Sequence, residues 1–68
     1  MTGLTGLAGL RRRVAMLEEA EADHTRQAAR KDLTEYQRNK HANLARAAAR
    51  DLKAARRNLR RAEKEQQQ

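Results

Sequence analysis

The segment "NLARAAARDLKAARRNLRRAEK", residues 43–64, contains no glycine or proline and consists mostly of strong helix formers. On a helical wheel at 100° per residue, its leucines and a subset of its alanines fall within about 80° of one another. This apolar seam consists of Leu44, Ala48, Leu52, Ala55, Leu59 and Ala62. A helix with one apolar seam buries it against another element, so the segment predicts an all-α fold with coiled-coil-like packing.

The same helix-forming composition extends from residue 10 to about residue 65, since no glycine follows Gly9 and the chain has no proline. Two further apolar stripes precede the seam, and the second is rotated from the first by roughly 120°. A straight heptad helix drifts only about 20° per heptad, so the chain must bend. The first stripe is Leu10, Val14 and Leu17, and the second is Ala22, Ala29, Leu33 and Tyr36.

The stretch "NKHAN", residues 39–43, is the predicted position of the bend. Asn39 is suited to the C-terminal end of one helix and Asn43 to the N-cap of the next. We therefore predict a helical hairpin of residues 10–38 and 43–65, with one long bent helix as the alternative. Asp32 and Glu35 in "DLTE" have capping-box spacing, which leaves a local helix start there as a further alternative.

The C-terminal helix segregates its charges. Six cations lie on the side opposite the seam, centred about 170° away on the wheel, and Arg61 lies nearby, whereas the acids Asp51, Glu63 and Glu65 flank the seam. The sequence predicts that this basic ridge binds anions, including the phosphates of nucleic acid, although such a face can also serve only solubility. The ridge consists of Arg46, Arg50, Lys53, Arg57, Arg60, Arg61 and Lys64.

The N-terminal stretch "TGLTGLAGL", residues 2–10, repeats Gly-Leu every three residues. Three glycines cost a helix about 3 kcal/mol in total, so residues 1–9 are expected to form a flexible docking arm that orders on a partner. A tail without function and a membrane-surface arm are the alternatives. Residues 10–65 would form the helical unit and 66–68 a frayed tail. The predicted protein-interface residues are Leu4, Leu7, Leu10, Val14, Leu17, Leu33, Tyr36, Leu44, Leu52 and Leu59.

An acidic cluster, Glu18, Glu19, Glu21 and Asp23, lies between two basic segments. In a hairpin these acids would face the arginines at 56–61, or they would order two chains head to tail. Exposed ion pairs contribute about 0–1 kcal/mol each, so they would set register more than stability.

Composition limits the function classes. Only 9 of 68 residues are Leu, Ile, Val or Phe, the net charge is +7 and there is no cysteine. Such chains often fold only on a partner, and thiol chemistry is excluded. His24 and His41 have no second ligand at helical spacing, so we expect no metal site, no cofactor and no catalytic residues. No apolar run suggests a membrane span or a secretion signal, which predicts a cytoplasmic or assembly-bound protein.

These observations predict a small, non-enzymatic structural subunit. It would fold on docking into a larger assembly, of nucleoprotein or virion type, through its Leu/Ala seams and with its basic face toward an anionic surface. Its partner would be another protein or a second copy of itself. The alternative is a free-standing helical protein that binds DNA or RNA through the backbone, independently of sequence. Binding to a membrane surface is the least favoured possibility.

Overall fold

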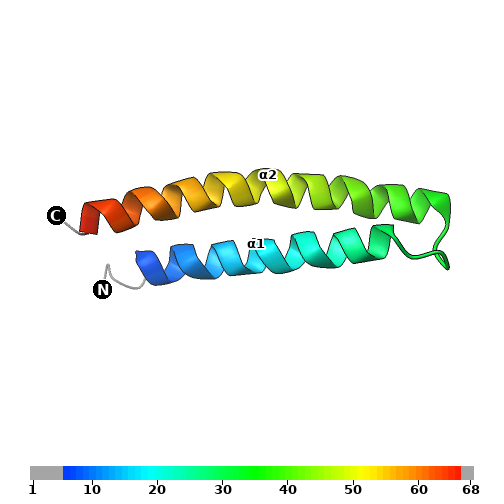
Figure 1. Cartoon of the computed structure of the whole chain (residues 1–68), viewed down its shortest axis with the longest axis horizontal. Coiled ribbons are helices and arrows are strands. Elements are labelled where there is room, and N and C mark those ends of the chain that lie inside the picture. The colour runs from blue at the N-terminus through cyan, green and yellow to red at the C-terminus, as the bar shows by residue number, and fades with distance from the viewer. Residues whose placement is uncertain (1–5, 67–68) are drawn as a thin grey trace.

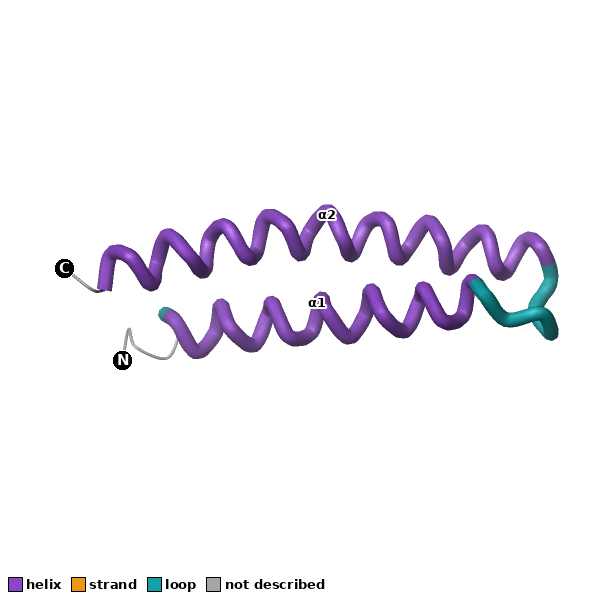
Figure 2. The backbone as a smooth tube through the Cα atoms, in the orientation of Figure 1, coloured by secondary structure: helices purple, strands orange, loops and turns teal. Residues whose placement is uncertain are grey.

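The computed structural model describes residues 6–66, which form two antiparallel helices joined by a short turn (Figure 1). Helix α1 spans Leu7–Ala28 and helix α2 spans Glu35–Gln66. The helices lie side by side, so the start of α1 and the end of α2 meet at the same end of the molecule (Figure 2). The predicted helical hairpin is confirmed, and its longest dimension is 51 Å.

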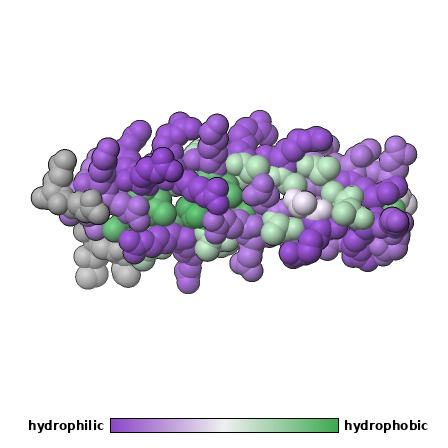
Figure 3. Space-filling view, in the orientation of Figure 1, coloured by the Kyte–Doolittle hydropathy of each residue, from purple (hydrophilic) through white to green (hydrophobic). Residues whose placement is uncertain are grey.

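The core of the hairpin is small and belongs to α2. Among the described residues, the buried side chains are Ala48, Leu52 and Ala55, which are 7%, 3% and 4% exposed. All three belong to the predicted seam, and the small alanines let the two helices approach closely. Helix α1 contributes half-buried residues and no fully buried one. In Figure 3 the apolar side chains form a band between the helices, with polar side chains along both outer edges.

The position of the turn differs from the prediction. The chain reverses at residues 29–34, whereas residues 39–43 lie inside α2, so Asn39 and Asn43 cap nothing. The stripe predicted to run from Ala22 to Tyr36 is therefore not one helix face, because it crosses the turn. The reason is local: side chains on either side of the turn hydrogen-bond to end one helix and to start the next.

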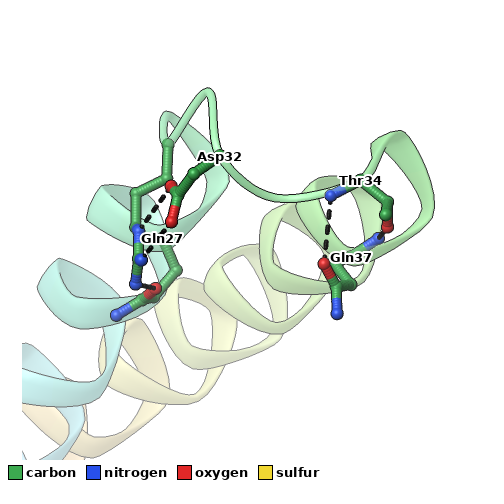
Figure 4. Close-up of polar contacts among 5 residues, drawn as sticks. Gln27, Asp32, Thr34 and Gln37 are labelled. Atoms are coloured by element: carbon green, nitrogen blue, oxygen red, sulfur yellow. Dashed lines mark hydrogen bonds and ion pairs between the residues drawn. The ribbon is translucent and has the colours of Figure 1, made fainter.

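Helix α1 ends through a tightened last turn. The N–H groups of Ala29 and Arg30 donate to the carbonyls of Arg26 and Gln27, both at 3.1 Å. The Arg30 guanidinium then donates to Gln27 Oε1 at 3.0 Å and, through Nε, to Asp32 Oδ1 at 2.9 Å (Figure 4). The hydrogen bond from Arg30 lowers the pKa of the Asp32 carboxyl. This contact therefore supports the fold fully at neutral pH and is lost only as the pH falls through that lowered pKa.

Helix α2 begins with a reciprocal capping box. The N–H of Gln37 donates to Thr34 Oγ1 at 3.1 Å, and the N–H of Thr34 donates to Gln37 Oε1 at 3.0 Å (Figure 4). The first helical bond follows, from the Arg38 N–H to the Thr34 carbonyl at 2.9 Å. The acid Glu35 in the first turn suits the positive end of the helix dipole.

Replacing Thr34 with alanine removes this cap and should lower the free energy of unfolding by about 1 kcal/mol. Urea unfolding followed by circular dichroism measures the loss. Thr25→Ala is the matched control, since Thr25 lies exposed within α1. There the change should be neutral or slightly stabilising, because alanine is the better helix former. Equal losses at the two positions would show that the cap does not hold the turn.

At the other end of the hairpin, residues 7–9 of the predicted arm belong to α1. Leu7, Ala8 and Gly9 form the first turn of α1. Leu7 is half-buried and an ion pair between Arg11 and Glu63 ties this end to α2, which offsets the cost of a helical glycine. Leu4 and the rest of residues 1–5 lie outside the described residues. In the predicted tail of residues 66–68, Gln66 is the last residue of α2, and residues 67–68 lie outside the described residues.

Candidate nucleic-acid interface

The positive charge of the described chain is concentrated on one helix. Helix α1 carries four arginines and four acids, so its charges balance. Helix α2 carries ten arginines and lysines against four acids. The hairpin therefore presents a neutral helix and a strongly basic one, and an anionic partner is attracted to α2.

All seven residues of the basic ridge are exposed along α2. From residue 46 to residue 64 the ridge runs about 27 Å at 1.5 Å per residue. Within residues 6–66, the four ion pairs use other arginines, namely Arg11, Arg26, Arg30 and Arg56. Within the described part of the chain, the one hydrogen bond that a ridge guanidinium donates is from Arg46 to Asn43 Oδ1, at 2.9 Å. The ridge cations are thus available to an external anion.

Two shallow grooves gather part of the ridge into a concave surface. The larger, of about 490 Å³, is lined by Glu21 of α1 and by Ala49, Leu52, Lys53, Arg56, Arg57 and Arg60 of α2. The smaller, of about 250 Å³, is lined by Arg57, Arg60, Arg61 and Lys64. Because both grooves use Arg57 and Arg60, they form one basic trough along the C-terminal half of α2. Five of the seven predicted cations line this trough, and Arg46 and Arg50 lie nearer the turn.

Arg56 lines the trough although the wheel of α2 does not place it on the ridge. It donates to Glu18 Oε2 at 2.8 Å, across the helix pair. The expectation that the acidic cluster faces residues 56–61 is confirmed for this pair. Both side chains are about half exposed, so the contact fixes the relative position of the helices more than it stabilises them.

The predicted protein-interface residues fall into three groups. Leu52 is buried inside the hairpin, whereas Tyr36 and Leu44 are 75% and 41% exposed. Six others are half-buried: Leu7, Leu10, Val14 and Leu17 on α1, Leu33 in the turn and Leu59 on α2. Most of the predicted seam is therefore used within the chain.

His24 and His41, which the sequence did not bring together, are part-buried and meet across the helix pair. Their Nδ1 atoms lie 3.0 Å apart and their ring centres 5.2 Å apart. The distance between the ring centres is close to the Nδ1–Nδ1 distance plus the distance from each ring centre to its own Nδ1. The two nitrogens therefore point at each other. At 3.0 Å the two nitrogens are at hydrogen-bond distance, shorter than the about 3.3–3.4 Å that separates two nitrogens bound at about 2.0–2.1 Å to one tetrahedral zinc ion.

This contact requires one ring to donate from Nδ1–H and the other to accept at Nδ1. A two-bond ¹H–¹⁵N correlation spectrum at neutral pH should show one ring of each kind. In the His24→Ala variant, His41 should return to a mixture of tautomers, and unfolding should cost about 0.5–1.5 kcal/mol less. Two rings in the same tautomer would contradict this hydrogen bond.

Among residues 6–66 no group of three or more His, Asp or Glu side chains is arranged to hold a metal ion. Within the same part of the chain, neither helix is apolar over a length that could cross a bilayer. Comparison with protein-family models, with curated proteins and with solved structures gave no match.

Proposed function

We propose that this chain is a small, non-enzymatic interaction protein that binds the phosphate backbone of nucleic acid through the basic ridge of α2. The ridge contacts phosphates along one wall of a groove or along one strand. Helix α1 packs on α2 and keeps it rigid. The affinity then comes from the attraction between the ridge cations and the phosphates, and it falls steeply as the salt concentration rises.

The observation that carries this proposal is the availability of the ridge. Seven exposed cations lie along one helix, and the ion pairs of the described residues use none of them. Acids capable of neutralising them are present on α1, yet Glu18 contacts Arg56 and Asp23 contacts Arg26. The fold thus leaves uncompensated charge on one side, where a polyanion is the complementary partner.

The chemistry of the ridge favours backbone contacts over base recognition. Arginine forks match phosphate oxygens and bind them through two hydrogen bonds. Stacking of unpaired bases needs several aromatic side chains, and Tyr36 is the one Phe, Trp or Tyr residue in the sequence. The ridge length of about 27 Å matches about eight base pairs at 3.4 Å each, so we expect about six phosphate contacts.

We favour nucleic-acid binding over docking through the Leu/Ala seam because the seam already packs against α1 inside the hairpin. A partner helix at Leu52 would have to displace α1, since Leu52 is 3% exposed. The ridge needs no such rearrangement. Membership of a larger nucleoprotein assembly is compatible with this proposal, with the ridge facing the nucleic acid.

The experiment is binding of the purified chain to a labelled duplex of random sequence between about 0.05 and 0.3 M salt. We expect micromolar affinity near 0.15 M salt and a log–log slope of about −5, for about six phosphate contacts. A second random duplex of different sequence should bind equally. Binding that vanishes by about 0.15 M salt, or that discriminates strongly between the two duplexes, would overturn the proposal.

A further inference from the structure

Helix α1 has an exposed apolar face that the hairpin does not use. A groove of about 380 Å³ runs along it, lined by Gly9, Arg12, Arg13, Met16, Leu17 and Ala20. Met16, which lines this groove, is 62% exposed. Gly9, Met16 and Ala20 lie within about 40° on the helix, and the two small residues leave room for a second backbone.

We propose that a second copy of this chain docks on this face, α1 packing antiparallel on α1 with Met16 at the two-fold axis. The product is a four-helix assembly in which the two hairpins meet through α1. Because the interface is symmetric, the same patch must complement itself.

Charge complementarity identifies a second copy as the occupant. Along α1 the basic triplet Arg11–Arg13 precedes the acidic residues Glu18–Asp23. Reversing the partner helix brings its acidic half against the basic half of the first, whereas a parallel partner would oppose like charges. Arg12 and Glu19 are both exposed, and neither takes part in an ion pair within residues 6–66.

The positions of Arg12 and Glu19 fit the two-fold axis. They are seven residues apart, so they lie on the same flank of α1, within about 20° of each other. Reversal about Met16 brings Arg12 of one copy within about 1.5 Å, along the helix axis, of Glu19 of the other. The axis therefore produces this ion pair twice. The small core adds a reason for association, since only Ala48, Leu52 and Ala55 are buried within the described hairpin.

The absence of cysteine gives a direct test, since Met16→Cys introduces the only thiol of the chain. At the axis, two such residues can reach the Cα separation of about 4.4–6.8 Å that a disulfide needs. Ala22→Cys is the matched control, exposed on α1 but turned about 120° away from Met16. Under mild oxidation without nucleic acid, Met16→Cys should cross-link at least about tenfold faster. Equal rates would overturn the proposal.

Charge reversal tests the register independently. Relative to the wild type, the single variants Glu19→Arg and Arg12→Glu should each shift the monomer–dimer equilibrium toward the 7.8 kDa monomer, as measured by sedimentation equilibrium. The double variant restores opposite charges across the axis and should recover the dimer. A monomeric wild type, or a double variant no better than the single ones, would contradict the proposed register. These measurements contain no nucleic acid, so their outcome is separate from that of the binding experiment.

Discussion

Replacing Leu52 with alanine should lower the free energy of unfolding by about 2–5 kcal/mol. Leu52 is the one large side chain among the three buried residues, at 3% exposure. Its neighbours in the core, Ala48 and Ala55, are too small to fill the space that the substitution leaves. Because the hairpin has no second buried cluster within its described residues, a loss of this size removes most of its stability.

The measurement is thermal and urea unfolding at one fixed chain concentration, followed by circular dichroism at 222 nm. Leu44→Ala is the matched control, since it makes the same chemical change on the same helix at a position that is 41% exposed. Its cost should stay below about 1 kcal/mol. Similar losses at Leu44 and Leu52 would show that the seam is not the core that holds α1 to α2.

Neutralising the trough is expected to have the largest effect on binding. The triple variant Arg57→Gln, Arg60→Gln and Arg61→Gln removes three cations from the two connected grooves. Each lost phosphate contact makes the log–log salt slope less steep by about 0.9, so the slope should fall from about −5 to between −2 and −3. At 0.1 M salt the affinity should drop by between about 10-fold and 500-fold.

A charge-matched variant separates the site from the net charge. Arg13→Gln, Arg26→Gln and Lys31→Gln also remove three cations, all from outside α2. If the ridge is the binding site, this variant should retain the steep slope and lose affinity less than about tenfold, since only long-range attraction weakens. An equal loss of affinity in the two triple variants would mean that binding depends only on the net charge and that α2 is not the binding site.

The helices and the seam could be predicted because their signals are local in sequence. Helix propensity and a 3.6-residue period place Ala48, Leu52 and Ala55 on one face, and the cations on the opposite face follow from the same wheel. The turn could not be placed in this way. Residues 29–34 contain neither glycine nor proline, and the contacts that close the turn depend on the conformation already formed. The usable signal was the T-x-x-Q pattern of Thr34 and Gln37, two residues beyond the spacing noted in "DLTE".

The parts of the site that escaped prediction all involve both helices. A wheel describes one helix, so it finds the ridge but not the trough, whose wall includes Glu21 and Arg56. The pairing of His24 with His41 follows from where the chain reverses, and a turn placed at 39–43 puts His41 in the turn itself. Once the turn is at 29–34, both histidines belong to facing helices and their contact becomes predictable.

The turn has a further consequence for the size of the molecule. Among the described residues none has a positive φ, so every residue of the turn adopts backbone angles open to any L-amino acid. The reversal therefore needs no glycine, and side-chain hydrogen bonds of Arg30, Asp32, Thr34 and Gln37 help to close it. Folded double, the chain is 51 Å long. As one uninterrupted rod, residues 7–66 would measure about 90 Å. The distance over which this protein spreads its positive charge is thus decided by a short segment that carries little of that charge.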